Sequence, residues 1–183
     1  MNTLQYYKKY EDGFEPFFAT AGSACFDLKA YFAKSIVSGE ERPKCKVYKM
    51  DNKPEERECK MWAIENHSFN VGIDLYPGER ILVPTGLIFN IPDGHSVRLH
   101  ARSSVSLKKG LIIPNGEGII DSDYYHQTFV MLYNASADEV RIWHGDKIAQ
   151  GELVKTLDYN LEQTETLPEQ TTNRVGGFGS TGV

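Results

Sequence analysis

Hydrophobic and polar residues alternate along many short segments of this chain, with the period of two residues that is typical of a β-strand. These segments are rich in β-branched and aromatic residues, and turn pairs such as PG, PDG, NG and HGD separate them. The pattern predicts an all-β sandwich or barrel. The predicted strands are KCKVYKM, ECKMWAI, FNVGIDL, RILVPTGLIFNI, SVRLHA, LIIPN, TFVMLYN and KIAQGELVK.

A helical pattern is predicted only for RSSVSLKK, which follows a strand segment directly. Arg102, Ser103 and Ser104 supply a guanidinium and two hydroxyls at its start. A helical turn that begins there also directs backbone N–H groups outward, toward an anion. The simpler interpretation is helix capping by Ser103 or Ser104, and on this segment alone it is the better one.

Two further segments differ from the strand pattern. Residues 44–64 predict a β-hairpin whose two strands flank the charged loop DNKPEER, inside an insertion over about 34–70. Residues 156–173 are polar, with few large apolar side chains, and predict a flexible linker. We therefore expect a β-domain over 1–155, then this linker, then a glycine-rich arm over 174–183.

Length, charge and cysteine content narrow the class of protein. A chain of 183 residues is one domain of ordinary size with a real core. The net charge of −5 argues against binding to nucleic acid polymers or to an anionic membrane. The three cysteines have no zinc-site spacing, and their odd number favours a cytoplasmic or otherwise intracellular, reducing compartment. We expect neither a signal peptide nor a transmembrane helix.

The stretch GEGIIDSDYYHQ places two acids one residue apart after an apolar run. An extended backbone would put Asp121 and Asp123 on the same side of the chain. Asp121 directly follows the apolar run, so we expect its carboxylate at the edge of the core, where activation of a water molecule is one use for an acid. Asp123 is more simply a turn residue. Tyr124 offers a flat face beside both acids.

Asn115 lies six residues before Asp121, and we expect it across a hairpin from that acid. Its side-chain amide both donates and accepts hydrogen bonds, which suits the imide edge of a base such as uracil. Asn115 also lies in PNG, a strong turn sequence, so turn formation is the simpler role.

The end of the chain, RVGGFGSTGV, combines glycines with hydrogen-bond donors. Successive N–H groups of a glycine-rich segment can point at one anion. Ser180 and Thr181 add hydroxyls, and Arg174 adds a charged fork. Phe178 suits stacking on a flat ring. On this segment alone, a disordered tail is the better interpretation.

Five separated stretches, taken in order, resemble the five motifs of the homotrimeric dUTPase family. Any one stretch is weak evidence, whereas the ordered set is highly specific. PGERILVPTGLIFNIPDG also resembles the strand pair that the family has before its second motif, so most of the chain outside 31–72 and the linker is covered. The five stretches are AGSACFDLKA (21–30), ARSSVSLKKG (101–110), NGEGIIDSDY (115–124), GDKIAQ (145–150) and RVGGFGSTG (174–182).

The resemblance implies a jelly-roll-like β-barrel, assembled as a homotrimer with shared active sites. It also implies a reaction, the hydrolysis of dUTP to dUMP and pyrophosphate by in-line attack of water on the α-phosphorus. Such an enzyme keeps uracil out of DNA and supplies dUMP for dTMP synthesis. The implied cofactor is Mg²⁺, held mainly by the triphosphate and not directly by protein side chains.

The resemblance also implies a role for each matching residue. Asp121 matches the acid that orients or deprotonates the attacking water, and Tyr124 matches the aromatic that packs on the deoxyribose and excludes a 2′-hydroxyl. Asn115 matches the residue that recognises uracil, and Phe178 matches the ring that closes over the base. The other implied substrate contacts are Arg102, Ser103, Ser104, Gly118, Ile120, Gln150, Arg174, Gly179, Ser180 and Thr181, with Asp27 as a supporting residue.

Two alternatives stay open. A dCTP deaminase or deaminase–diphosphatase on the same fold needs a glutamate base near the third motif, where Glu117 is available, although IIDSDY fits the diphosphatase pattern far better. A different class is a regulatory module that binds a protein partner through residues 44–64, with Met61 and Trp62 on the surface. We prefer the interpretation that this hairpin packs on its own barrel or on a neighbouring subunit.

Overall fold

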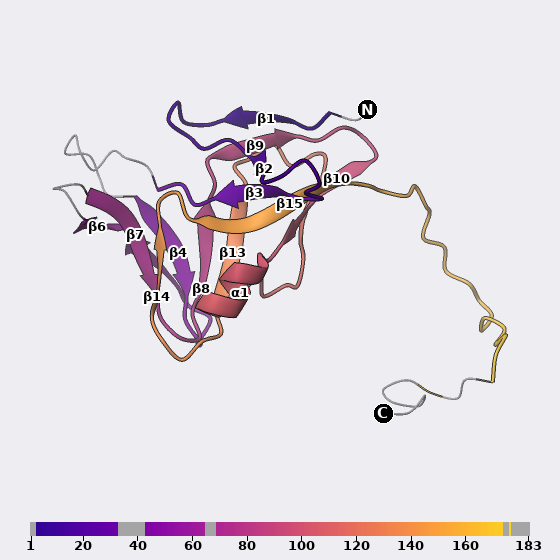
Figure 1. Cartoon of the computed structure of the whole chain (residues 1–183). Helices are drawn as coiled ribbons and strands as arrows, with labels where there is room; N and C mark the ends of the chain where they lie inside the picture. The colour runs from indigo at the N-terminus through magenta and orange to yellow at the C-terminus, as the bar shows by residue number, and fades with distance from the viewer. Residues whose placement is uncertain (1–2, 33–42, 65–68, 174–175, 177–183) are drawn as a thin grey trace.

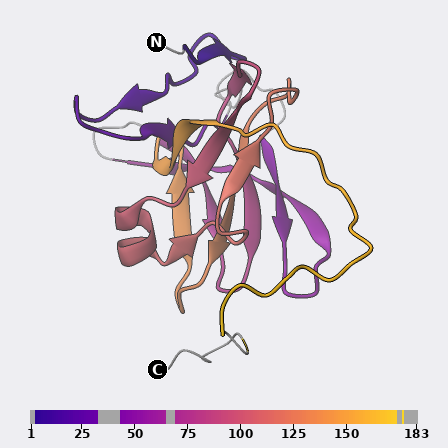
Figure 2. The same ribbon diagram turned by 90° about the vertical axis from the view of Figure 1, so that its right-hand side faces the viewer.

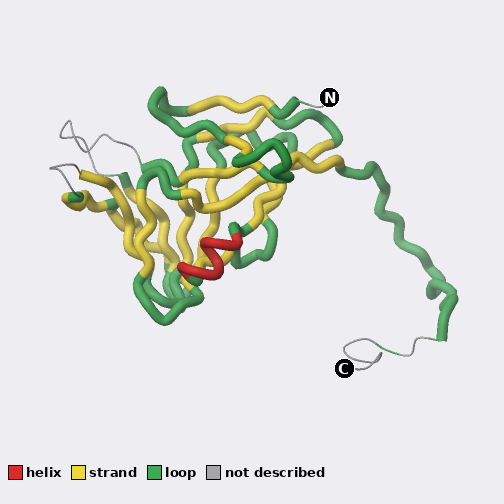
Figure 3. The backbone as a smooth tube through the Cα atoms, viewed as in Figure 1, coloured by secondary structure: helices red, strands yellow, loops and turns green. Residues whose placement is uncertain are grey.

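The computed structural model describes residues 3–32, 43–64, 69–173 and 176. Strands dominate these ranges, and one short helix, α1 (Ser103–Lys109), lies on the outside of the sheets (Figure 1, Figure 3). The predicted all-β, jelly-roll-like fold is confirmed.

One five-stranded antiparallel sheet carries most of the predicted motifs. Its central strand is β15 (Lys147–Lys155), which pairs with β10 (His95–His100) on one side and with β3 (Phe26–Lys29) on the other. The outer strands are β12 (Gly118–Ile120), next to β10, and β2 (Phe17–Phe18), next to β3. The first, third and fourth motif segments therefore supply β3, β12 and β15 of this sheet, and the second motif segment follows β10 directly.

A second five-stranded sheet forms the opposite side of the molecule. Its strand order is β11 (Leu111–Ile112), β13 (Phe129–Asn134), β8 (Arg80–Pro84), β4 (Lys44–Tyr48) and β5 (Pro54–Glu58). Buried positions alternate with half-buried ones along β8 and with exposed or half-buried ones along β13, as the pattern of the sequence predicts.

Two smaller sheets complete the fold. β14 (Val140–Trp143), β7 (Phe69–Leu75) and β6 (Lys60–Ala63) form one of them. The other consists of β1 (Gln5–Lys8) and β9 (Leu87–Asn90), and it brings the amino-terminal segment over the main sheets (Figure 2).

All of the larger sheets bury apolar side chains in a single core. Leu28 and Val97 come from the first sheet, Val83 and Val130 from the second, and Ile73 from the three-stranded sheet. Each of these side chains is at most 1% exposed. Burying one such side chain stabilises the fold by about 1.5–3 kcal/mol, so the interior holds the sheets in place.

The predicted helix is present, but its capping differs from the expectation. Arg102 is the N-cap residue and makes no side-chain capping hydrogen bond, while Ser103 and Ser104 are the first two helical residues. Both serines are exposed. The interpretation of either serine as the cap is wrong, because the extended backbone at Arg102 places the helix start one residue earlier than a serine cap requires.

The predicted hairpin at 44–64 is also arranged differently. The strand β4 pairs with β5, so the charged sequence PEERE is itself a strand and not a loop. The segment ECKMWAI supplies β6, which pairs with β7 in another sheet. The charge of this segment suggested a solvated tip, but alternate residues of β5 face inward, where Arg57 finds buried acceptors.

Arg57 joins the inserted hairpin to the rest of the domain. Its guanidinium donates to both carboxylate oxygens of Glu79, at 2.6 and 2.7 Å, and to the carbonyl of Asp74 at 2.8 Å. Burial alone would raise the pKa of the Glu79 carboxyl, but the Arg57 hydrogen bonds and the Tyr76 N–H outweigh it, so that this pKa lies below its usual value.

A second contact holds β6 on the same domain. The rings of Trp62 and Trp143 meet edge to face, with centroids 5.1 Å apart, and the Arg141 guanidinium lies 4.0 Å from the Trp62 centroid. These contacts support the interpretation that the hairpin packs on its own domain. A protein partner for residues 44–64 stays a prediction.

Residues 156–173 form neither helix nor strand, and nearly all of their side chains are exposed. The segment leaves the sheets after β15 and extends away from them (Figure 1). Its flexibility, and the division of the chain at 155 and 173, stay predictions.

We predict that Glu79→Gln lowers the free energy of unfolding by about 2 kcal/mol at neutral pH, because it removes the charge of one of the two carboxylates that pair with the half-buried Arg57 guanidinium and leaves only Glu55. Since the pKa of Glu79 is lowered by folding, its contribution is fully present above the ordinary glutamate pKa of about 4.3 and is lost as the pH falls through the lower, folded value. Urea unfolding at several pH values measures this difference.

The matched control is Glu56→Gln, on the exposed face of the same strand, which should change stability by less than about 0.5 kcal/mol. Equal stability of the Glu56 and Glu79 variants would contradict the anchoring role of Arg57.

Candidate active site

The first, second and fourth motif segments meet around a buried acid. Asp27 on β3 is 5% exposed, and its two carboxylate oxygens lie 2.8 Å from Arg102 Nε and 2.9 Å from Lys147 Nζ. Gln150 on β15 pairs with Asp27 and donates a hydrogen bond of 3.2 Å to the carbonyl of Ala101. The segment immediately before α1 is therefore held by two contacts, the ion pair of Arg102 with Asp27 and the hydrogen bond from Gln150 to Ala101.

Arg102 stands at the start of α1, beside the hydroxyls of Ser103 and Ser104. The first hydrogen bonds to the Arg102 carbonyl come from the N–H groups of Val105 and Ser106, so the amide groups of the two serines precede the helical ladder. A guanidinium, two hydroxyls and these amide groups lie together at one point of the surface, as the sequence analysis predicts.

The third motif segment lines two adjoining cavities. Asn115, Gly118 and Ile120 border a cavity of about 160 Å³. Asp121 and Tyr124 border a second cavity of about 270 Å³, and Ile120 contributes to both. The structure thus brings these five predicted residues to one region of the surface.

Asp121 lies where the buried strand ends and the chain turns outward. Ile120 is 7% exposed, whereas Asp121 is exposed, as expected for an acid at the edge of the core. The Tyr124 N–H donates to the Asp121 carbonyl at 3.2 Å, so the chain turns here and does not continue as a strand. An extended strand that aligns Asp121 with Asp123 is therefore not formed.

Asn115 belongs to a tight turn, as PNG predicts. Gly116 has φ 76°, and Asn115 Nδ2 donates to the Glu117 carbonyl at 2.9 Å. The expected hairpin between Asn115 and Asp121 is wrong, because β11 pairs with β13 while β12 pairs with β10. The turn crosses from one sheet to the other, which sequence alternation alone does not reveal.

Arg102 and Asp121 do not meet within one chain. Val97 on β10 lies opposite Ile120, and the strand runs from there to Arg102 while Asp121 continues in the opposite direction. The distance between them is the length from Val97 to Arg102 plus the step from Ile120 to Asp121. At about 3.3 Å per residue, this amounts to roughly 20 Å. The remaining predicted residues, Arg174, Phe178, Gly179, Ser180 and Thr181, lie outside the described ranges.

The sequence analysis missed two charged residues of this region, Lys147 and Arg98. Lys147, which neutralises Asp27, lies within the fourth motif segment, but nothing in the sequence indicates its partner. Arg98 Nη1 lies 3.0 Å from a carboxylate oxygen of Glu117. The glutamate considered as a deaminase base is thus ion-paired, and it does not line either cavity.

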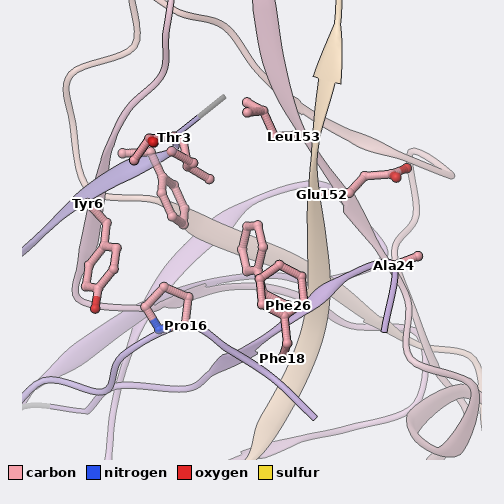
Figure 4. Close-up of a pocket in the computed structure, with 10 residues that line it drawn as sticks. Thr3, Tyr6, Pro16, Phe18, Ala24, Phe26, Glu152 and Leu153 are labelled. Carbon is pink, nitrogen blue, oxygen red and sulfur yellow. The ribbon is translucent and has the colours of Figure 1, made fainter. Parts of the chain in front are cut away.

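A separate hollow of about 350 Å³ lies between the amino-terminal segment and β15 (Figure 4). Its wall is mostly apolar and includes the rings of Phe18 and Phe26, which meet edge to face. Glu152 is at its border, where His100 Nε2 lies 3.0 Å from the Glu152 carboxylate. None of the predicted site residues that the structure describes lines this hollow.

Within the described ranges, no three histidine, cysteine, aspartate or glutamate side chains are grouped as a metal site would need. In the same part of the chain, no helix is long and apolar enough to cross a membrane.

The fold and the cavity linings together are typical of an all-β nucleotide hydrolase, because an exposed acid lies beside an aromatic face and a turn that presents an amide. Sequence comparison then defines the family. The dUTPase family model matches residues 70–182, and the chain belongs to this family.

Curated relatives agree with the family match. The chain is 34% identical over 168 residues to a deoxyuridine 5′-triphosphate nucleotidohydrolase of Caulobacter vibrioides. This alignment covers 92% of this chain and 85% of the relative. It is 42% identical over 111 residues to the enzyme of the same name from Brucella melitensis, covering 61% of this chain and 70% of the relative.

Solved structures share the fold. A mutant dUTPase of Staphylococcus bacteriophage 80alpha with dUpNHpp aligns over 100% of both chains, with a TM-score of 0.69 and 20% identity. The dUTPase of phage phi11 of S. aureus, described with a structural Mg(II) ion, aligns over 90% of this chain and 98% of that chain, with a TM-score of 0.60 and 19% identity.

We predict that Asp27→Asn lowers the free energy of unfolding by about 3 kcal/mol, because it leaves Arg102 and Lys147 without their shared counter-charge. A double-mutant cycle with Arg102→Met should give a coupling energy of about 1–3 kcal/mol in denaturant unfolding. Strictly additive effects would show that the pair at 2.8 Å does not hold the start of α1.

Proposed function

We propose that this chain hydrolyses dUTP to dUMP and pyrophosphate, with Asp121 as the group that orients or deprotonates the attacking water. One observation carries the assignment of that role. Among the described residues that line the two adjoining cavities, Asp121 is the one carboxylate. A carboxylate in such a position can take a proton from water, or align it, as the nucleophile approaches phosphorus.

The same cavities supply the groups that recognise the nucleoside. Asn115 presents an amide to the base, together with the backbone of Gly118 and the side chain of Ile120. The ring of Tyr124 is held by its hydroxyl, which donates to the Gln127 carbonyl at 3.1 Å. A ring fixed in this way packs on the deoxyribose and leaves no room for a 2′-hydroxyl, which excludes UTP.

The residues at the start of α1 hold the phosphates. Arg102 and the hydroxyls of Ser103 and Ser104 donate to phosphate oxygens, and Gln150 supports the segment that carries them. Asp27 orients the Arg102 guanidinium. These donors offset the charge of the triphosphate, and more strongly as charge shifts to the leaving pyrophosphate.

The residues present fit a magnesium ion whose ligands come mainly from the nucleotide. Magnesium prefers oxygen ligands and keeps several water molecules, and the cavities offer a single carboxylate, Asp121. When bound, Mg²⁺ neutralises phosphate charge. The protein residues then keep the tasks of binding the nucleotide and aligning the water.

A dCTP deaminase is less well supported. Its glutamate base would be Glu117, whose carboxylate pairs with Arg98 at 3.0 Å and is not among the described side chains that line the cavities. The pairing leaves Asp121 as the acid that can act on a bound nucleotide.

We also propose that three copies of the chain assemble and share their sites. The roughly 20 Å between Arg102 and Asp121 is too long for one nucleotide site to use both from a single chain. In addition, apolar side chains next to the cavities stay exposed on the outer face of the second sheet and on β12. These side chains, Ile112, Ile119, Phe129 and Met131, are 38–56% exposed, which favours cover by another copy.

The glycine-rich arm then closes over a site formed by other copies. The 18 residues of 156–173 span up to roughly 60 Å when extended, enough to reach a neighbouring subunit. Phe178 would stack on uracil, while Arg174, Gly179, Ser180 and Thr181 would bind the γ-phosphate. Contacts with both ends of the nucleotide together offset the conformational entropy that the arm loses when it becomes ordered.

The cell interior is the proposed location, in a reducing compartment. Cys25, Cys45 and Cys59 are free thiols, and the Sγ atoms of the latter two lie 4.0 Å apart without a bond. Free buried thiols are typical of reducing conditions.

We predict that Asp121→Asn lowers kcat for dUTP by about 100-fold or more while the KM stays within about threefold, because the substitution removes a group needed only in the transition state. Pyrophosphate release from dUTP, dCTP and UTP in the presence of Mg²⁺ measures both constants and the specificity. Asp123→Asn, one turn residue away, is the matched control and should retain activity. A wild-type kcat in the Asp121→Asn variant would contradict the proposed role of Asp121. Release of ammonia from dCTP would favour the deaminase.

A second prediction concerns shared sites. Asp121→Asn and a chain truncated before Arg174 should each be nearly inactive alone. Mixed after mild denaturation and reassembly, they should regain activity, since some sites combine an intact Asp121 with an intact arm from another copy. Native mass spectrometry confirms the exchange of subunits and their number. Confirmed exchange without recovered activity would contradict shared sites.

A further inference from the structure

We propose that Arg98 and Glu117 are positioning residues for substrate recognition, because they fix the turn that presents Asn115 to the base. The proposal rests on the proposed role of Asn115 in reading uracil. It concerns an ion pair between β10 and the third motif segment: Arg98 lies outside the five motif segments, and neither Arg98 nor Glu117 is among the described residues that line the cavities.

The backbone of Glu117 holds Asn115 from both sides. The Glu117 N–H donates to the Asn115 carbonyl at 2.9 Å, and the Asn115 side-chain amide donates to the Glu117 carbonyl at 2.9 Å. Any movement of Glu117 therefore moves both the backbone and the side chain of Asn115. Glu117 thus sets the position of the recognition turn.

The side chain of Glu117 ties this turn to β10. One carboxylate oxygen lies 3.0 Å from Arg98 Nη1, and the other lies 3.7 Å from His100 Nδ1. Arg98 is itself oriented, because its Nε donates at 3.0 Å to the hydroxyl of Ser96, which is 2% exposed. His100 is held in turn by the Glu152 carboxylate at 3.0 Å.

The turn that contains Asn115 needs an attachment of this kind to β10. Gly116 sits between Asn115 and Glu117 with φ 76°, and glycine restricts its own conformation less than any other residue. Asn115 is exposed and precedes β12, whose pairing with β10 begins only at Gly118. The ion pair of Glu117 with Arg98 extends the attachment to β10 by one residue, up to the edge of the turn.

Loosening the turn should weaken base recognition and leave the chemical step nearly intact. The contacts of Asn115 with the base are the same before and during phosphorus attack, so they contribute equally to the ground state and the transition state. Loss of such uniform binding raises KM and leaves kcat nearly unchanged. A merely structural role would instead reduce the folded fraction, which lowers apparent kcat at constant KM.

The experiment compares Glu117→Ala, Arg98→Met and the double variant in the full chain, with steady-state kinetics on dUTP and dCTP. Each single variant should raise KM for dUTP by about 10-fold, the loss expected of one hydrogen bond to a charged group, with kcat within about twofold. The double variant should be no worse than either single one, because both remove the same interaction. The preference for dUTP over dCTP should fall in parallel.

Two further variants make the result specific. Glu117→Gln keeps an acceptor for Arg98 and should restore most of the affinity, leaving KM within about threefold of the wild type. Glu139→Ala is the matched control: its carboxylate pairs with Arg141 Nη2 at 3.5 Å, it is 41% exposed against 43% for Glu117, and it lines neither cavity. Its KM should not change.

Asn115→Ala separates this proposal from the one it rests on. If Asn115→Ala raises KM for dUTP but Glu117→Ala and Arg98→Met do not, the positioning role is wrong and the role of Asn115 stands. If Asn115→Ala itself leaves KM unchanged, the recognition role of Asn115 fails, and the positioning role fails with it. Additive effects of the two single variants, or a drop in kcat at constant KM, would also overturn the positioning role.

Discussion

The buried carboxylate of Asp27 is the constraint on which the rest of this structure depends. A charge that is 5% exposed is costly unless opposite charges accompany it into the interior. Arg102 and Lys147 meet that requirement, one from the segment before α1 and the other from β15. Because β3 must then stay next to β15, and the start of α1 must stay next to β3, three segments far apart in the chain are held in one arrangement. The charge balance that stabilises this side of the fold is also what aims the Arg102 guanidinium.

In the proposed reaction, two parts of the surface bind different parts of the substrate. The start of α1 carries cationic and hydroxyl donors suited to phosphates, whereas the cavities around β12 carry an acid, an aromatic ring and an amide suited to a deoxynucleoside and a water molecule. One chain keeps Arg102 and Asp121 apart, because β10 and β12 run in opposite directions from the pair of Val97 and Ile120. The proposed assembly of several copies joins them, and it also covers the apolar side chains that the outer face leaves exposed. In this proposal, catalysis and association depend on the same surfaces.

Particular elements show how far the sequence could be interpreted. The strand over 147–155, the helix over 103–109 and the turn at PNG follow from local patterns, because alternation, helix-forming residues and an Asn-Gly pair act through neighbours in the chain. The strand PEERE was missed for the opposite reason. Its charges suggest a loop until Arg57 is seen to reach Glu79, 22 residues away. The supposed hairpin between Asn115 and Asp121 failed similarly, because the pairing of β11 and β12 with different sheets is a long-range choice. The serine cap was wrong for another reason, since the extended backbone at Arg102 makes that residue the N-cap.

By itself, the sequence determined the fold class and the family, and it named the residues that we propose to carry the chemistry. Those properties reside in local periodicity and in ordered motifs, which do not require knowledge of distant contacts. Only the tertiary structure decided which motifs meet. It placed Asp27 with Arg102 and Lys147, separated Arg102 from Asp121, and paired Glu117 with Arg98. The physical reason is that strand order and register depend on burying one common core and compensating each buried charge, and these conditions involve the whole chain at once.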